Sequence, residues 1–539
     1  MDENKRLLVM NRFFFRVLIF SMLCTLTINL IAQIQPVTEV APNSTQYTIP
    51  SWTLYKRALT SSTHNQPTND ELVKAKQYLV AKSMPYAVNM TLNGDPVSNM
   101  GFAWFTNQGE KEEMIKIIKG SAKDTSSFSK PLMTINATSE AVNNLNYCVA
   151  ANNLSKLAGI PNNTRKSYTS NKVLVNGLKA NTSYSFIVGK PGAWSQIGTF
   201  TTAKKNKDEF SFIYFTDPQA NDDAQFDISQ KTTHAAVNMF PNANFLLSCG
   251  DLVNSSGSGN SEWEYEQFFE TQQDIWYTKP FAPVIGNHDF SPNKNFYYHF
   301  NTASPSFDKK MATIPGSVYS FVYGDALFMA LDFEDYRVDG YLDSLSLWMK
   351  KEVLAHPDVK WRIAFYHKTI YTGGNIHQAA HDSKVVRDIM APLFDELKID
   401  LAIQGHDHIY EVIGPVKNKS LVEKSVSMQA KVQPTYRTNV TGKLGGTFDV
   451  TNGTLYFLNN SSGKKKYEPN DSYTMKSIEV NLGITDYFSF FTGRFGQTGE
   501  PTFSNITVST DAININTFTV NDDGKATLFD TISIVKKAR

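Results

Sequence analysis

The segment KIDLAIQGHDHIYE, residues 398–411, joins an apolar run to two histidines that stand two positions apart. The run ends at Ile403, and His406 and His408 follow it. Residues i and i+2 of an extended segment point to the same side, so both imidazoles can face one metal ion. Ordinary loop histidines would give the same pair, and the rest of the chain has to decide between these two interpretations.

Four other apolar runs also end in residues that bind metals. The runs are FSFIYF (210–215), ANFLLS (243–248), KPFAPVI (279–285) and VKWRIAFY (359–366). Asp217, Asp251, Asn287 with His288, and His367 follow them in that order. Ligand sites of open α/β sheets lie at the carboxyl ends of the strands, so these side chains are predicted to converge on one crevice. Two divalent ions about 3.5–4 Å apart require a donor set of this size.

Helical patterns separate several of these runs. In SKVVRDIMAPLFDELK, residues 383–398, the apolar side chains recur with the spacing of one helix face. A second helix is predicted over residues 261–276. Strands that alternate with helices indicate a layered α/β domain. Residues 500–536 alternate as strands do and are predicted to complete the pair of sheets, whereas residues 414–470 are interpreted as an insertion.

The chain before residue 206 has a different organisation. Residues 85–205 contain short strands separated by turns such as NGDP, which predicts an all-β sandwich. Residues 1–32 have a basic start and an apolar stretch shorter than the roughly 20 residues of a membrane span. They are predicted to be a removable signal peptide, although a retained anchor would have the same pattern. Residues 33–84 are interpreted as a polar lead-in segment.

The charge balance argues against one class of partner. Lys and Arg total 52 and Asp and Glu total 51, which gives a net charge of +1. A protein that binds nucleic acid needs a basic surface, so no nucleic-acid partner is expected. The predicted signal peptide indicates an exported protein, which is periplasmic, on the cell surface or secreted. No stable membrane span is expected once that segment is removed, and the sequence has no signal for an oligomeric state.

The five strand ends contain motifs that resemble those of a known family. TDPQ (216–219), GDLVN (250–254), GNHD (286–289), YHK (366–368) and GHDH (405–408) resemble, in order, the signature blocks of the calcineurin-like metallophosphoesterases. A fibronectin type III-like domain before them is similar to the arrangement in purple acid phosphatases. The resemblance covers residues 85–413 well and residues 414–539 loosely. It implies an α/β layered sandwich of two mixed β-sheets flanked by helices over residues 206–539, preceded by the fibronectin III-like sandwich at 85–205.

The resemblance also implies a role for each strand-end residue. The implied ligands are Asp217, Gln219 and His408 for the first ion, Asn287, His367 and His406 for the second, and Asp251 as the bridge between the two. The ions would be iron, zinc or manganese. His288 would hydrogen-bond the phosphate and protonate the departing oxygen, with Asp289 orienting its ring. A hydroxide that bridges the two ions would attack the phosphorus.

Two positions depart from the family pattern. Family members have His, or Gly in the purple branch, where this chain has Gln219, which is a weaker donor. The purple branch also has a tyrosine, whose bond to ferric iron gives the colour, where this chain has Asn254. We therefore predict a protein without that absorption band. We also predict a first site that is less selective for iron(III).

Some residues are candidates for substrate contact by their position alone. Asn254, His377 and His381 are predicted to reach the substrate, although exposed loop histidines would look the same at the last two positions. The lysine run 464–466 in SSGKKKYE would attract an anionic substrate, although such a run is usually a solvated loop.

The sequence as a whole predicts an exported, acid phosphatase-like enzyme that hydrolyses small phosphate monoesters with two metal ions. A phosphodiesterase that acts on nucleotides or lipid headgroups would use the same chemistry, and it stays open as an alternative. A second alternative is a non-catalytic surface binding module with a decayed metal site, which Gln219 and Asn254 would favour.

Overall fold

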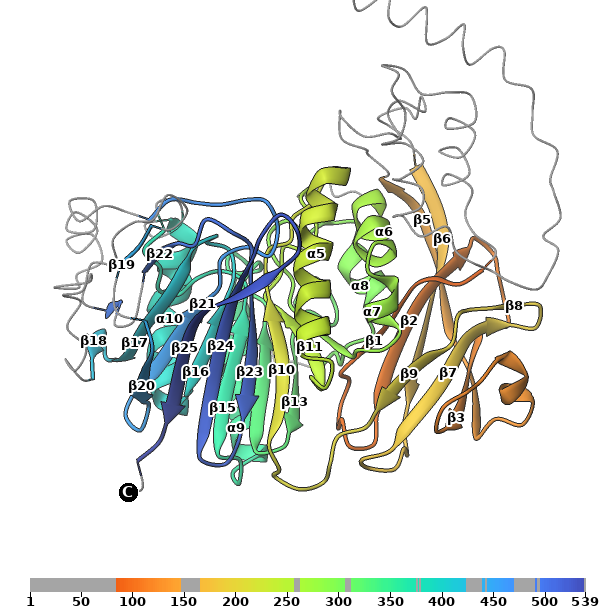
Figure 1. Cartoon of the computed structure of the whole chain (residues 1–539), viewed down its shortest axis with the longest axis horizontal. Coiled ribbons are helices and arrows are strands. Elements are labelled where there is room, and N and C mark those ends of the chain that lie inside the picture. Colours follow the sequence, from red (N-terminus) through yellow and green to blue (C-terminus); the bar gives the residue numbers. More distant parts are fainter. Residues whose placement is uncertain are drawn as a thin grey trace, which may run out of the picture. The chain divides into compact units, whose positions relative to one another are not determined.

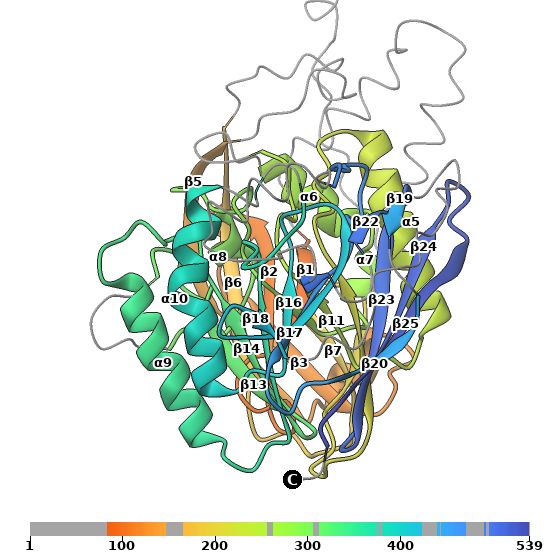
Figure 2. The same ribbon diagram turned by 90° about the vertical axis from the view of Figure 1, so that its left-hand side faces the viewer.

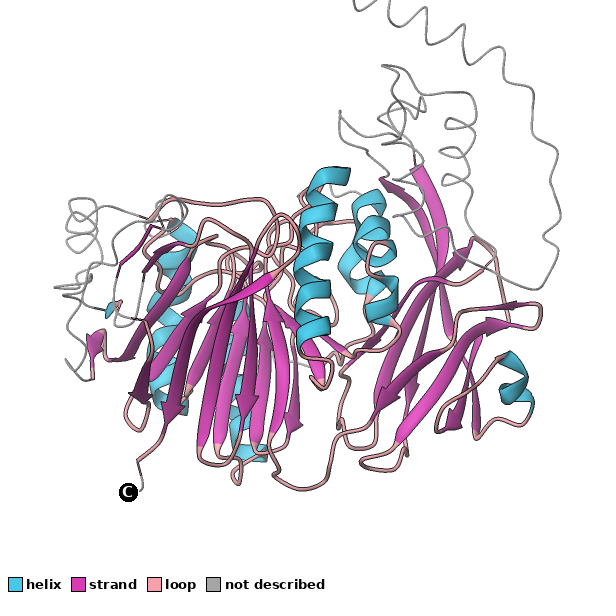
Figure 3. Ribbon diagram, viewed as in Figure 1, coloured by secondary structure: helices cyan, strands magenta, loops and turns pink. Residues whose placement is uncertain are grey.

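The computed structural model describes residues 84–146, 165–255, 262–305, 312–374, 377, 380–422, 439–441, 444–469, 490–491 and 495–537. All of them belong to one compact unit. They form three β-sheets, and the α-helices pack on the two larger sheets (Figures 1 and 3). The predicted signal peptide and residues 33–83 of the predicted lead-in segment lie outside the described residues.

The first sheet has eleven strands in the order β20-β25-β24-β23-β10-β11-β12-β1-β2-β6-β5. Their bounds in that order are Gly446–Asp449, Ala526–Val535, Ala512–Val520, Thr502–Val508, Phe210–Phe215, Phe245–Ser248, Phe281–Pro283, Tyr86–Thr91, Met100–Asn107, Arg165–Val175 and Thr138–Asn146. β10, β11 and β12 run parallel to one another, whereas β23 pairs antiparallel with β10. The sheet is therefore mixed, as the family resemblance implies.

The second sheet has nine strands, with β13-β14-β15-β16-β21-β17-β22-β19 in order and β18 paired to β17. The bounds of the eight ordered strands are Tyr319–Tyr323, Ala326–Leu331, Trp361–Tyr366, Leu401–Gln404, Thr454–Leu458, Tyr410–Lys417, Phe495–Gln497 and Asn439–Thr441, and β18 is Ser420–Leu421. β14, β15, β16 and β21 are parallel, and β13 and β17 are antiparallel to their neighbours.

A third, five-stranded sheet lies within the N-terminal part of the described chain. It contains β3 (Met114–Lys119), β4 (Met133–Asn136), β7 (Ser183–Lys190), β8 (Ala193–Trp194) and β9 (Gly198–Thr201). The short 3-10 helix η1 (Thr125–Ser129) precedes β4. The other N-terminal strands, β1, β2, β5 and β6, continue the first sheet beyond β12. Residues 147–164, which belong to the predicted all-β region, lie outside the described residues.

The main core lies between the first two sheets. Phe212 and Phe245 of the first sheet stack with ring centroids 5.0 Å apart, and Phe328 of the second sheet meets both rings edge-on. Ile363 and Ile403 of the second sheet are fully buried in the same cluster. Each such side chain contributes about 1.5–3 kcal/mol when it is removed from water. This burial fixes the two sheets face to face and brings their strand ends together.

Helices cover the outer faces of these sheets. α9 (Tyr341–Ala355) and α10 (His381–Leu397) lie side by side over the second sheet (Figure 2). Met390 and Phe394 of α10 pack in one cluster with Tyr366 and Tyr456 of that sheet. α5 (Asp223–Met239) contacts β10 and β23 of the first sheet, and α6 (Glu262–Glu270) and α7 (Gln273–Trp276) contact β1. α8 (Asn295–His299) contacts β2.

The structure confirms some of the sequence predictions and corrects others. The sandwich of two mixed sheets flanked by helices is confirmed, and so are the strands within residues 500–536, which form β23, β24 and β25. The interpretation of residues 414–470 as an insertion is wrong in part, because β21 (454–458) is a buried strand between β16 and β17. Sequence patterns also missed β13, β14 and α9.

Candidate metal centre

The predicted ligands stand in the loops that follow five strands of the two large sheets. Asp217, Asp251 and Asn287 follow β10, β11 and β12 of the first sheet. His367 follows β15 of the second sheet, and His406 follows β16. The face-to-face packing of the sheets brings these loops together, which explains how residues far apart in sequence share one site.

The loops leave their strands through unusual backbone conformations. Asp217, Gln219, Asp251 and His406 have φ angles of +52°, +35°, +50° and +76°. This left-handed region costs a residue with a Cβ roughly 1–2 kcal/mol. Two hydrogen bonds between loops help to hold it, since the Asp217 N–H donates to the Gly250 carbonyl at 3.1 Å and the Gln219 N–H donates to the Asp251 carbonyl at 3.1 Å. Such strain is found at functional sites where the surrounding structure enforces it.

Two glycines allow the loops to approach this closely. A Cβ on Gly286 would stand 2.2 Å from Oδ1 of Asp251. A Cβ on Gly405 would stand 2.5 Å from the Cys249 carbonyl oxygen. No side chain fits at either distance, so the glycines of the GNHD and GHDH motifs are required by packing.

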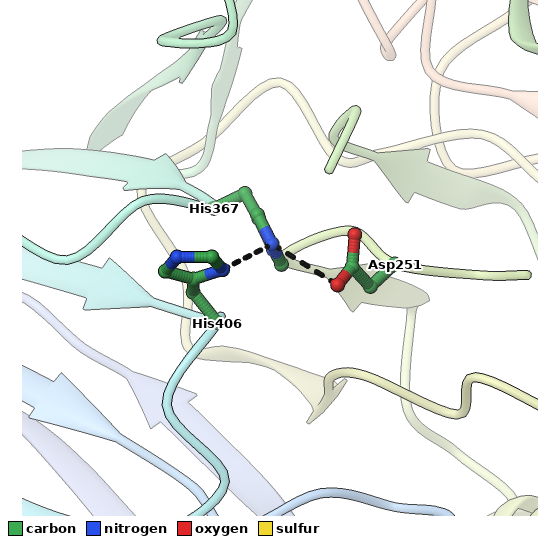
Figure 4. Close-up of side chains that lie close together, drawn as sticks. All are labelled: Asp251, His367 and His406. Atoms are coloured by element: carbon green, nitrogen blue, oxygen red, sulfur yellow. Dashed lines mark hydrogen bonds and ion pairs between the residues drawn. The ribbon is translucent and has the colours of Figure 1, made fainter. Parts of the chain in front are cut away.

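Three of the predicted ligands form a tight cluster. Asp251, His367 and His406 each offer one ligand atom, and these atoms all lie within 4.8 Å of one another (Figure 4). Nε2 of His367 lies 3.3 Å from Oδ2 of Asp251 and 3.0 Å from Nδ1 of His406. All three residues are buried. The arrangement presents one carboxylate and two imidazoles to a common point.

The other predicted ligands adjoin this cluster. Nε2 of His408 lies 3.3 Å from Oδ1 of Asp217, whose carboxylate also accepts the His406 backbone N–H. Nε2 of Gln219 donates to Oδ2 of Asp251. Oδ1 of Asn287 lies 3.0 Å from Nε2 of His367.

Unpaired polar atoms show that this donor set fits metal ions. Nε2 of His406, Nδ1 of His408 and Oε1 of Gln219 are buried and have no hydrogen-bond partner among the described residues. Leaving such an atom without a partner costs about 1–3 kcal/mol. Carboxylate oxygens and imidazole nitrogens are ligands for iron, zinc and manganese. A cation at the cluster would satisfy these atoms.

The electrostatics of the cluster are those of a cation site. Burial lowers the pKa of the His367 imidazole, but the carboxylates of Asp251 and Asp217 outweigh burial and raise this pKa to about 10. Burial lowers the pKa of His406 well below its ordinary value, and the charges of His377 and His367 add to that effect. His406 is therefore neutral, as a metal ligand must be, whereas His367 would release a proton when a cation binds.

The two predicted catalytic residues lie beside the cluster. The His288 backbone N–H donates to Oδ1 of Asp251 at 2.8 Å, and Nδ1 of its ring contacts the Asn254 carbonyl. The buried Asp289 carboxylate accepts the N–H groups of Gly286 and Leu252, as well as the Tyr265 hydroxyl. Asp289 thus fixes the loop that bears His288. Burial, followed by the nearby charge of Asp251, raises the pKa of Asp289 to about 7.

The predicted substrate contacts differ in position. The His377 ring stacks on His406 with centroids 3.6 Å apart, and its Nδ1 lies 2.6 Å from Oδ1 of Asp407. His381 is exposed at the start of α10, and its ring lies 6.1 Å from that of Tyr336. Asn254 is partly buried and offers its backbone carbonyl to His288. His377 and Asn254 therefore lie beside the cluster. The ring contact of His381, by contrast, is with Tyr336.

Sequence reasoning missed several residues that surround the centre. The Tyr467 ring lies nearly parallel to His408, with centroids 4.3 Å apart and an angle of 8°. Glu264 of α6 accepts the backbone N–H groups of Asn254 and Ser255 at 2.7 and 2.9 Å. The lysine run 464–466 is the signal nearest to Tyr467 in the sequence, because it would attract an anionic substrate. No sequence pattern distinguishes Tyr467 or Glu264 from ordinary surface residues.

Two family models match the described part of the chain. Residues 210–410 match the calcineurin-like phosphoesterase family, and residues 85–202 match the family described as the purple acid phosphatase N-terminal domain. Two uncharacterized proteins from Mycobacterium tuberculosis strains are 21% identical over 345 residues, which cover 59% of this chain and 62% of theirs. Probable purple acid phosphatase 20 of Arabidopsis thaliana is 22% identical over 272 residues, which cover 48% of this chain and 60% of that protein. The chain thus spans about three fifths of the length of these curated relatives.

Solved structures share the fold. Purple acid phosphatase PPD1 from yellow lupin (Lupinus luteus) seeds superposes with a TM-score of 0.59 and 14% identity, over 85% of this chain and 76% of the lupin chain. A structure of PhoD gives a TM-score of 0.56 and 10% identity, over 84% of this chain and 91% of that chain. At these identities the likeness extends to the fold alone.

Proposed function

Since the chain belongs to the calcineurin-like metallophosphoesterases of the purple acid phosphatase type, which are hydrolases of phosphoric esters, we propose that it is an exported, metal-dependent phosphatase that acts on phosphate monoesters. One observation supports this function above others. The loops after five strands of two sheets converge on a buried cluster that could hold a cation, and a cation there would satisfy the buried Nε2 of His406.

The proposal assigns the cluster to two ions. Asp251 is the shared ligand, and the remaining ligands are Asp217, Gln219 and His408 for one ion and Asn287, His367 and His406 for the other. Iron, zinc and manganese all suit this set of carboxylate, amide and imidazole donors. Two ions held there supply a Lewis-acid clamp for phosphate oxygens and an activated water for attack on phosphorus.

The residues around the ions do the remaining work. In this proposal His288, whose Nδ1 contacts the Asn254 carbonyl beside the cluster, donates a proton to the leaving oxygen. Asp289 holds the His288 loop because its carboxylate accepts hydrogen bonds from the backbone N–H groups of Gly286 and Leu252 and from the Tyr265 hydroxyl. The His377 ring packs against His406 and limits the positions that His406 can adopt.

The export part of the proposal rests on residues 1–32, whose basic start and apolar stretch are typical of a signal peptide. The proposed organisation continues with a lead-in segment over residues 33–84, an N-terminal β domain over 85–205 and the phosphoesterase domain over 206–539. No helix within the described residues is long and apolar enough to cross a membrane.

Removal of metal is expected to abolish activity. The protein as purified should contain about two ions per chain, and a chelator should reduce hydrolysis of an aryl phosphate to background. Separate addition of Fe, Zn and Mn should restore activity with at least one metal, and a melting curve before and after chelation serves as the control for folding. Full activity without bound metal would contradict the proposed function. A purified protein that binds no metal would instead indicate a binding module.

A protein loaded with ferric iron is expected to lack the tyrosinate absorption band of purple enzymes. Asn254 stands where the family tyrosine would bind iron, and it offers only a backbone carbonyl, to His288. The visible spectrum of the iron-loaded protein tests this expectation. An intense band would overturn it, and disappearance of that band in Tyr467→Phe would assign the bond to the ring that stacks on His408.

A further inference from the structure

The segment 459–469 docks against both halves of the metal centre. At its start, the Ser461 hydroxyl donates to the Asp217 carbonyl at 2.6 Å, and the Ser462 N–H donates to the Thr216 carbonyl at 2.8 Å. Gly463 approaches so closely that a Cβ there would stand 2.1 Å from the Pro218 carbonyl oxygen. This end of the segment is therefore tied to the backbone that bears Asp217.

The other end of the segment is tied to His408. The Tyr467 N–H donates to the His408 carbonyl at 3.2 Å, and the Tyr467 ring stacks on the His408 ring. Nε2 of Gln497 donates to the carbonyls of both residues at 2.8 Å. The three lysines 464–466 therefore span two anchors, each of which is attached to a proposed metal ligand.

Only the middle lysine of the three is partly buried. Lys464 and Lys466 are exposed, and Nζ of Lys466 donates to the Gly499 carbonyl away from the ligands. Lys465 is half-buried, and the described residues offer it no hydrogen bond or ion pair. The acidic groups near enough to act on its ammonium are three residues of the centre, Asp251, Asp217 and Glu264.

The leaving-group side of the site also lies near Lys465. Its positive charge acts on the His288 ring and on the Glu264 carboxylate. The Glu264 oxygens are already used by the N–H groups of Asn254 and Ser255 and by the Ser255 hydroxyl. Ligand carboxylates that held metal ions would have their charge offset, so Glu264 would be the acidic group left near the ammonium. A bound phosphate group would supply further negative charge.

We propose that Lys465 binds the non-bridging oxygens of the substrate phosphate and thereby makes the site select monoesters over diesters. This inference rests on the proposed phosphatase function and names the residue that would select its substrate class. A monoester phosphate has about two negative charges near pH 7, whereas a diester has one. Coulomb attraction scales with the product of the charges, so a fixed ammonium favours the monoester.

The test compares Lys465→Met with the wild type on an aryl phosphate monoester and a bis-aryl phosphate diester. The methionine keeps most of the side-chain length and removes the charge. We expect kcat/KM for the monoester to fall about 10- to 100-fold, as for the loss of one hydrogen bond to a charged group, and the diester to lose less than about tenfold because its charge is smaller. The inhibition constant of inorganic phosphate should rise in parallel with the monoester effect.

Matched variants and two further readouts complete the design. Lys464→Met removes an exposed neighbouring lysine and should leave both rates unchanged, whereas Lys465→Arg should restore most of the monoester preference. Equal losses on both esters together with a lower melting temperature would show that Lys465 only supports the loop, which overturns the proposal. Unchanged monoester to diester ratios would also overturn it. If the wild type hydrolyses neither ester, the proposed function itself fails, and that outcome is distinct.

Discussion

Replacement of Asp251 by asparagine is expected to lower turnover of an aryl phosphate by about 10³-fold or more, because it removes the negative charge that the two proposed cations would share. The side chain keeps its shape, and its Oδ1 can still accept the His288 N–H at 2.8 Å. The ion pair with Nε2 of His367 at 3.3 Å is lost. The measurement is kcat/KM together with the metal content, which should fall below two ions per chain.

The matched control for this variant is Asp343→Asn, since Asp343 is an exposed carboxylate on α9. It should leave both activity and metal content unchanged. Near wild-type rates in Asp251→Asn would refute the proposed bridging role. Metal loss without loss of rate would do the same, because it would separate the chemistry from the cluster of Asp251, His367 and His406.

Replacement of Gly286 by alanine is expected to reduce activity about 100-fold or more, although the residue has no functional side chain. The new Cβ would stand 2.2 Å from Oδ1 of Asp251 and 2.4 Å from its backbone nitrogen, so the carboxylate or its loop has to move. A displacement of about 1 Å at a reacting centre is enough for a loss of this size. The measurements are kcat/KM, metal affinity and the melting temperature.

A second glycine separates this effect from the general cost of replacing glycine. Gly120 has a φ of +80° and nothing within 4 Å of an added Cβ. Gly120→Ala should therefore cost about 1–2 kcal/mol of stability through its backbone conformation and leave kcat/KM intact. If Gly286→Ala keeps full activity and metal affinity, the close approach of the two loops is not needed for the site.

The sandwich and the clustering of several site residues could be predicted from the sequence because both depend on local patterns. An apolar run followed by Asp, Asn or His marks a strand and its carboxyl end, and parallel strands bring such ends together. The structure places Asp251, His367 and His406 in one cluster, with His408, Asp217, Gln219 and Asn287 beside it. The roles of these residues are still a proposal that the variants above test.

Other parts of the fold could not be predicted because they depend on distant contacts. β14 also ends in carboxylates, but Asp332 accepts the Ser317 hydroxyl at 2.7 Å, and Glu334 pairs with Lys368 at 3.1 Å. A strand-end acid alone therefore does not identify a ligand. The same holds for the lysine run, in which the anchors at Ser461 and Tyr467 hold the segment that contains Lys465 beside two proposed ligands.

The first sheet continues through β12 into β1, where Thr91 pairs with Phe281. Further bonds cross the same junction, including those from Asn89 to the His299 carbonyl at 2.9 Å and from Thr91 to the Asn301 carbonyl at 2.6 Å. A buried Lys166–Glu266 pair at 3.3 Å adds to them. We therefore expect the two regions that match separate families to melt as a single cooperative body. A fragment that began at residue 206 would leave one edge of β12 without a partner strand. Unpaired strand edges are prone to self-association.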